Sequence, residues 1–371
     1  MLLPDNRGGM KYAEKGFIYV KDGIISDVGE GESPSEYKYP DILINGENRM
    51  IIPGMIDGYS ISYLSPLSSL IALSKIKKIS ENKDLLSVLS DTDVYYLTVI
   101  GVISRVMRGV TTVVTEIPKI DLAVKIADLL GVRMIAVVNI DRYSKEETAD
   151  HVLRMRKYER YKEDLLRVAF YTSRLELLEV IREFMPNNTV LIHWSLCDKI
   201  QDDSKVIVVD PPPDLCRNLM SISTDPNVSI DEVISGRKFI GTGANRSRIV
   251  TDNMIYQIDR TRLSIVDLFN RLTRDVAGVY GLPTGFIEKG LYSDLVMYDL
   301  SQPPASPFYH DKNILLRMIL WDMPRIESVI IGKEIIIDGG EILSVGSDLY
   351  RRAYRRLRDV IKDLASEELS S

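Results

Sequence analysis

The chain has 371 residues, of which 45% are hydrophobic and 27% are charged, and its formal net charge is −6. This length fits one large barrel with an accessory domain, and the balance of residue types is that of an ordinary globular protein. Because Lys and Arg are scattered among more numerous Asp and Glu, we expect no nucleic-acid partner.

The N-terminal part of the chain predicts β-structure. Two β-rich runs flank Asp22-Gly23, which predicts a hairpin over residues 16–29 with a type I′ turn. A polar loop follows at 30–39, and short strands are predicted at 41–44 and 49–52.

From Gly54 onward, strands alternate with helices. The predicted strands lie at 55–61, 109–116, 133–140, 166–171, 189–194, 206–210, 221–223 and 238–242. The predicted helices lie within 64–107, where Asp91 or Thr92 is an N-cap candidate, and at 120–130, 145–163 and 174–184. Roughly eight such units over ~200–250 residues indicate a closed α/β barrel with helices outside. About a dozen residues separate His193 from Val206, so one unit is expected to be shortened.

After Leu282 the pattern returns to short strands, predicted at 285–287, 294–298, 325–331, 334–337 and 341–345. We therefore expect an α/β fold, namely a distorted TIM-like (β/α)8 barrel plus a small β-sandwich built from both chain ends. The expected domains are a composite β-sandwich (1–52 and 283–345), the barrel (53–282) and a C-terminal helix (346–371). Residues 348–364 predict an amphipathic, Arg-rich helix, which we expect to pack on the sandwich with a solvated polar face.

Several segments, taken in their order along the chain, resemble the amidohydrolase superfamily, within the branch of cytosine deaminases, guanine deaminases and triazine hydrolases. They are Pro53-Gly54-Met55-Ile56-Asp57 at the start of the barrel, Gly109-Val110-Thr111-Thr112-Val113 at its second strand, Ile192-His193-Trp194 at its fifth strand, and residues 285–296 at the closing motif. The resemblance covers nearly the whole chain. It implies a hydrolase of carbon–nitrogen bonds other than peptide bonds that depends on a metal ion, and it implies a homodimer.

The catalytic residues of that family do not carry over. The two His of the first strand fall on Tyr59 and Ile61, the acid/base Glu falls on Leu196, and the Asp of the eighth strand falls on Gly243. Only the fifth-strand His is kept, as His193. A phenol and a sec-butyl group cannot jointly hold a divalent cation. We therefore expect no metal and no cofactor.

Two functions remain open. The first is a hydrolase with an altered or single-metal centre such as Zn²⁺, in which His193 would meet carboxylates such as Asp57, Asp198 or Asp210. The second is a non-catalytic protein on an amidohydrolase scaffold that binds a small molecule or serves in assembly. His193 is accordingly either a hydrogen-bonded structural histidine or a catalytic base or ligand.

Polar residues that end the strands are expected to face one mouth of the barrel. These residues are Tyr59, Glu116, Asn139, Tyr171, His193, Asp210, Thr224 and Thr242, with Ile61, Leu196 and Gly243 at family positions. They either recognise a ligand or hydrogen-bond to one another and cap helices. Glu116 either acts as a base or pairs with Lys119, Arg133 or Arg246. The Gly-rich segment 241–246 offers backbone N–H groups to an anion.

The cellular setting is predicted from what the sequence lacks. No apolar run reaches the ~18 residues of a transmembrane helix, so we expect no membrane contact. Residues 1–10 show no secretory pattern, which predicts the cytoplasm, and Cys197 and Cys216 are then expected to be free thiols. The charge-rich composition, with only three Gln, is typical of thermophiles.

Overall fold

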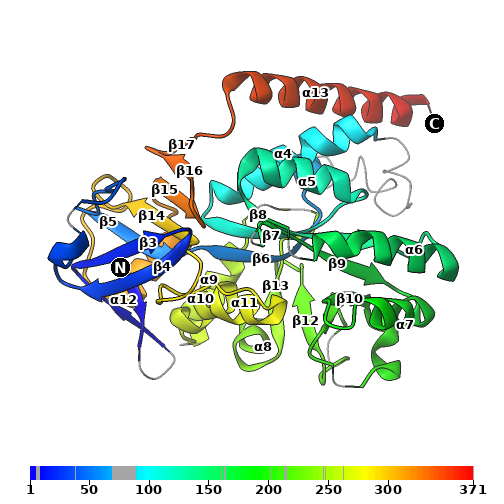
Figure 1. Cartoon of the computed structure of the whole chain (residues 1–371), viewed down its shortest axis with the longest axis horizontal. Helices are drawn as coiled ribbons and strands as arrows, with labels where there is room; N and C mark the ends of the chain where they lie inside the picture. Colours follow the sequence, from blue (N-terminus) through cyan, green and yellow to red (C-terminus); the bar gives the residue numbers. More distant parts are fainter. Residues whose placement is uncertain are drawn as a thin grey trace.

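The computed structural model describes residues 1–5, 9–37, 39–68, 89–159, 161–162, 164–201, 203–212, 215–244, 246, 248–261 and 263–370. Eight parallel strands form a nearly closed barrel, in the spatial order β13-β12-β11-β10-β9-β8-β7-β6 (Figure 1). These are β6 (Met55–Ser60), β7 (Val110–Glu116), β8 (Arg133–Asn139), β9 (Leu166–Thr172), β10 (Val190–His193), β11 (Val206–Val209), β12 (Met220–Ser223) and β13 (Lys238–Ile240). The predicted barrel is confirmed.

The first and last barrel strands meet just beyond their ends. Ser60 and Gly243 form a parallel bridge, the Gly243 N–H donates to the Tyr59 carbonyl over 3.0 Å, and the Ile61 N–H donates to the Gly243 carbonyl over 2.9 Å. A Cβ on Gly241 would lie 2.4 Å from the Tyr59 carbonyl oxygen, so this close approach of two backbones needs glycine there.

Helices surround the barrel because each buries one apolar face against the strands. They are α4 (Asp91–Val106), α5 (Ile120–Leu130), α6 (Lys145–Met155), α7 (Leu175–Phe184), α8 (Ile230–Ser235), α9 (Asp252–Thr261) and α10 (Ile265–Leu272). Ser90, rather than Asp91 or Thr92, caps α4 through a capping box with Asp93. Between β10 and β11 the described residues contain the six-residue 3-10 helix η4 (Trp194–Lys199) in place of an α-helix, which confirms the shortened unit.

Both chain ends build the second core. A five-stranded sheet has the order β17 (Glu341–Ile342), β16 (Glu334–Asp338), β15 (Ile326–Ile331), β14 (Leu295–Asp299) and β5 (Arg49–Pro53). Two-stranded sheets of β1 (Leu2–Pro4) with β2 (Met10–Tyr12) and β3 (Gly16–Lys21) with β4 (Ile24–Glu30) accompany it. Leu3, Ile25 and Leu295 belong to the apolar cluster that joins these sheets. Asp22 and Gly23 have φ values of 52° and 79°, as the type I′ turn requires.

The C-terminal helix α13 (Ser347–Ser370) lies along α4 rather than on the sandwich (Figure 1). Arg356 pairs there with Asp93, the residue that also completes the capping box of α4. The described elements outside the barrel wall also include two further α-helices and three short 3-10 helices. These are α11 (Arg274–Tyr280), α12 (Lys312–Trp321), η1 (Ser35–Tyr37), η2 (Ser65–Leu67) and η3 (Arg156–Tyr158).

Some sequence expectations are corrected. Residues 41–44 form no strand, and Ile42 and Leu43 are exposed, so no neighbouring strand pairs with them. Residues 285–287 form no strand either, and the helix predicted over 145–163 ends at Met155. Residues 69–88, part of the helical region predicted over 64–107, lie outside the described residues.

The two cysteines are not free thiols. Cys197 in η4 forms a disulfide with Cys216, across a sequence separation of 19 residues. Spacing along the chain carries no information on this pairing, because the two residues meet only when η4 and the loop before β12 fold against each other. Within the described ranges, no helix has both the length and the apolar composition needed to cross a membrane.

Candidate functional site at the barrel mouth

The barrel interior is packed with side chains. Inward-facing Ile56, Val114, Ile135, Leu191 and Ile207 form one cluster with apolar residues of α11, which covers the N-terminal ends of the strands. The barrel mouth, meaning the C-terminal strand ends and the loops after them, therefore carries the accessible polar side chains.

Glu116, the last residue of β7, forms the centre of the mouth with Tyr59 of β6. The Tyr59 hydroxyl donates to Glu116 Oε2 over 2.9 Å. Burial raises the pKa of the Glu116 carboxyl, although hydrogen bonds from Tyr59 and Asn139 and the charge of Arg142 oppose that rise. Asn139 is oriented for this contact because its Oδ1 accepts the Asp141 N–H over 3.1 Å.

The charge of this carboxyl acts on three nearby tyrosines. Burial, with a further contribution from Glu116, raises the pKa of both Tyr59 and Tyr63. Burial, then the charge of Asp141 and then that of Glu116, raises the pKa of Tyr171 in β9. These phenols are therefore neutral at physiological pH, and the Tyr59 hydroxyl is the one that donates to Glu116.

The other carboxylates of the mouth are used in local structure. Asp141 accepts from Thr172 Oγ1 and Ser173 Oγ, both over 2.7 Å. Asp210 accepts from the Thr224 N–H over 2.6 Å and from Thr224 Oγ1 over 2.7 Å. Both arrangements fix the turn that follows a strand.

His193 caps the 3-10 helix that follows it. Its Nδ1 lies 2.9 Å from Ser195 Oγ and accepts the Ser195 N–H over 3.3 Å, and its ring lies against Trp194. Leu196, at the family's acid/base position, is buried in the apolar cluster outside the barrel wall, with Val206 and Val208. The structure thus separates Leu196 from the mouth, although Tyr59, Glu116, Asn139 and Tyr171 come together there.

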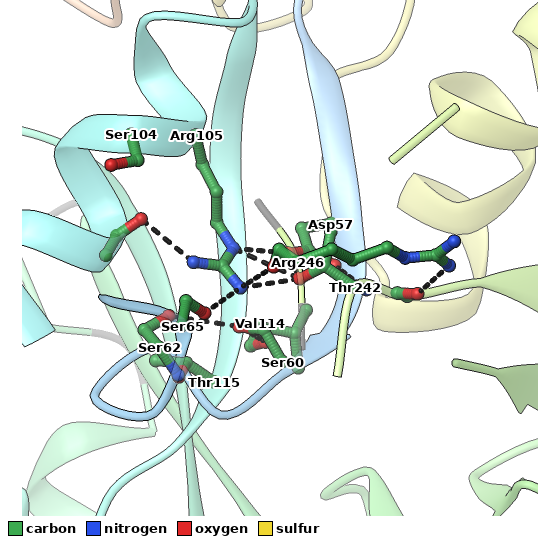
Figure 2. A network of polar contacts seen from close by, with 12 residues as sticks. Asp57, Ser60, Ser62, Ser65, Ser104, Arg105, Val114, Thr115, Thr242 and Arg246 are labelled. Atoms are coloured by element: carbon green, nitrogen blue, oxygen red, sulfur yellow. Dashed lines mark hydrogen bonds and ion pairs between the residues drawn. The ribbon is translucent and has the colours of Figure 1, made fainter. Parts of the chain in front are cut away.

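A buried ion pair joins the barrel wall to α4 beside the mouth (Figure 2). Arg105 and Asp57 are both fully buried, and Arg105 Nε lies 2.6 Å from Asp57 Oδ2. Thr242 completes the pair, because its N–H donates to Asp57 Oδ1 over 2.9 Å and its Oγ1 accepts from Arg105 Nη2 over 2.6 Å. The remaining guanidinium contacts reach Ser65 Oγ and the carbonyls of Gly101 and Arg246.

Three N–H groups of the Gly-rich loop after β13 are already used by the barrel and are not available to an anion. The N–H groups of Gly241, Thr242 and Gly243 already donate to Ser223 O, Asp57 Oδ1 and Tyr59 O. Arg246 donates from Nη2 to the Gly241 carbonyl over 2.7 Å (Figure 2). The predicted pairing of Glu116 with Lys119, Arg133 or Arg246 is replaced by Tyr59 and Asn139.

Potential metal ligands do not cluster in the described part of the chain. Among the residues that the structure describes, no three His, Cys, Asp or Glu side chains lie close enough together to hold an ion. The chain has only three His, and the two besides His193 are engaged elsewhere: His151 stacks on Tyr143 and His310 Nδ1 lies 2.9 Å from the Tyr12 hydroxyl.

Comparison of sequences matches part of the chain to a known protein. No protein-family model matches the chain. A stretch of 130 residues is 26% identical to the 5-methylthioadenosine/S-adenosylhomocysteine deaminase of Syntrophomonas wolfei, and this match spans 34% of the chain and 30% of that protein.

Solved structures match over almost the full length. Atrazine chlorohydrolase from Arthrobacter aurescens TC1, complexed with zinc, is 14% identical with a TM-score of 0.78, and the match covers 95% of this chain and 97% of that one. An adenosine deaminase from Xanthomonas campestris with bound zinc is 15% identical with a TM-score of 0.76, covering 97% of both chains. The resemblance to the amidohydrolase superfamily is thus confirmed at the level of the fold.

Proposed function

We propose that this protein binds an amino-substituted nitrogen heterocycle at the barrel mouth, without a metal ion and without metal-assisted hydrolysis. The observation that supports this function best is the Tyr59–Glu116 contact of 2.9 Å. In the family that the sequence resembles, the residue at the position of Tyr59 is a metal-binding histidine. Here it carries a phenol that orients a carboxyl group.

The chemistry of Glu116 suits such a ring. The carboxyl can accept a hydrogen bond from an exocyclic amino group, and its raised pKa favours a proton shared with a neighbouring ring nitrogen. Tyr59 holds one carboxyl oxygen, and the half-buried ring of Tyr171 lies near enough for the Glu116 charge to raise its pKa. An aromatic face beside a carboxyl is complementary to a planar ring with exocyclic N–H groups.

The relatives support the same ligand class. The structural neighbours are named for atrazine and adenosine, and the curated relative is named for 5-methylthioadenosine and S-adenosylhomocysteine. All of these molecules contain an amino-substituted nitrogen heterocycle. We extend this class, and not the reaction, to the present chain.

Three potential metal ligands are already committed to other contacts, which supports the metal-free part of the proposal. Asp57 pairs with Arg105, Asp210 binds Thr224, and His193 caps η4. Releasing Asp57 for a metal would leave a buried guanidinium uncompensated, which costs several kcal/mol.

A hydrolase that uses His193 as a base is the second candidate. This candidate rests on the 2.9 Å contact between His193 Nδ1 and Ser195 Oγ, which places a hydroxyl beside an imidazole. The same nitrogen accepts the Ser195 N–H, so this contact is that of a local helix cap. We therefore favour the binding function.

Calorimetric titration in the presence of EDTA tests the proposal. Melamine, adenine and cytosine are the probes, and unsubstituted purine is the control without an amino group. We expect the amino-substituted rings to bind, and Glu116→Leu to weaken binding about tenfold or more, because the hydrogen bonds to the carboxyl group are lost. The matched control is Glu179→Leu, on an exposed position of α7. Binding that needs added Zn²⁺, or that survives Glu116→Leu unchanged, would contradict the proposal.

A further inference from the structure

A cavity of about 350 Å³ lies at the end of the barrel opposite the mouth. Its lining includes Arg167 at the start of β9, Thr189 just before β10 and Lys205 just before β11. Because these strands are parallel, all three positions mark their N-terminal ends, whereas Glu116 marks a C-terminal end. The volume falls within the range of small-molecule sites, about 300–1,000 Å³.

Two cationic side chains line one part of the cavity. Arg167 is held in place, since its Nε donates to Asp164 Oδ1 over 2.8 Å and its Nη1 donates to the Tyr280 carbonyl over 3.0 Å. The ammonium group of Lys205 makes no ion pair within the described part of the chain, although Lys205 is only partly exposed. A half-buried ammonium group without a counter-charge favours a bound anion.

An amide side chain and a carboxylate line the same cavity. Asn188 is only 6% exposed, and its Oδ1 has no hydrogen-bond partner among the described residues. Glu159 adds an exposed carboxylate to the lining. Asn188 Oδ1 is shielded from solvent, so the Glu159 carboxylate is the acceptor of this lining that an N–H donor in the cavity can reach.

The N-terminal end of a barrel usually serves stability, and the side chains there usually pair with one another. This cavity departs from that pattern, because the Lys205 ammonium group has no ion-pair partner among the described residues, while Arg167 is held by Asp164 and the Tyr280 carbonyl. Tyr280 separates the cavity from the mouth, and its hydroxyl donates to the Gly58 carbonyl of β6 over 2.7 Å. The cavity is therefore distinct from the site at Glu116.

We propose that this cavity binds a free amino acid. The ligand's carboxylate would lie against Lys205 and the open side of the Arg167 guanidinium. Its ammonium group would face the Glu159 carboxylate. This inference does not depend on the function proposed for the mouth.

The experiment is calorimetric titration of the full-length protein with the twenty free amino acids, each alone, with acetate and methylammonium as probes that carry one charge only. We expect at least one amino acid to bind and both half-ligands to bind much more weakly. Lys205→Gln should weaken binding about ten- to a hundredfold, because one charge-assisted hydrogen bond is lost. Glu159→Gln should weaken it as well.

Two controls separate this site from the mouth and from general charge effects. Lys125→Gln, on an exposed position of α5, and Glu116→Gln at the mouth should both leave amino-acid binding unchanged. The inference is overturned if no amino acid binds, if acetate binds as tightly as the amino acid, or if Lys205→Gln binds like the wild type. Loss of amino-acid binding in Glu116→Gln alone would assign the ligand to the mouth and would equally overturn it.

Discussion

The hydroxyl of Tyr59 donates to Oε2 of Glu116 over 2.9 Å, which joins the ends of the first two barrel strands at the centre of the mouth. This hydrogen bond favours the ionised carboxyl and so opposes the effect of burial on the Glu116 pKa. We expect Tyr59→Phe to raise that pKa further. Titration of Glu116 by NMR, with the carboxyl carbon labelled, measures the change, and a lower or equal pKa in the variant would refute the assignment.

The raised pKa of Glu116 also predicts how stability depends on pH. An acid whose pKa is higher in the folded than in the unfolded protein contributes most stability below its unfolded pKa, and this contribution is lost as the pH rises through the folded pKa. Wild type should therefore lose stability relative to Glu116→Gln as the pH rises from acid towards neutral. Urea unfolding at successive pH values tests this, and a constant difference between the two proteins would be the contrary result.

The Asp57–Arg105 pair should be essential for stability. Arg105→Met leaves a buried, uncompensated carboxylate, so we expect a loss of about 3–5 kcal/mol in the free energy of unfolding. Chemical denaturation followed by circular dichroism measures it.

The matched test of this pair is the double variant Asp57→Asn with Arg105→Met. Removing both charges should cost less than the sum of the single changes, because neither charge is then left buried alone. Additive losses would show that the two residues act independently, against the 2.6 Å contact between them.

The disulfide gives a further prediction. Cys197→Ser with Cys216→Ser should lower the free energy of unfolding by about 3 kcal/mol, as expected for a cross-link across 19 residues. Thiol titration of the unfolded wild type, before and after reduction, is the control. Two reactive thiols before reduction would restore the sequence-based expectation of free cysteines.

Much of the barrel could be predicted because the residues that pack against the strands also form a local pattern in the sequence. The helix predicted at 120–130 matches α5, since its apolar face and the left-handed Gly131 that ends it are both local signals. The predicted hairpin turn at Asp22-Gly23 rests on the same kind of evidence. By contrast, residues 41–44 have the pattern of a strand, but Ile42 and Leu43 are exposed and pair with no strand among the described residues.

The site could be predicted only in part. Glu116, Asn139 and Tyr171 were found because strand ends converge in any parallel barrel. Arg105 was missed, although an arginine within an otherwise apolar stretch of α4 is a signal that it needs a buried partner. The cavity at the opposite end could not be found, because its lining comes from Glu159, from residues at or just before the starts of β8, β9, β10 and β11, and from the end of α11, which are far apart in the sequence.

The most direct test of a metal-free mouth is the metal content of the protein, measured by inductively coupled plasma mass spectrometry after purification without chelator from cells supplied with zinc. We predict far less than one equivalent of zinc, iron, manganese or nickel per chain. One full equivalent that is lost in His193→Asn would contradict the account.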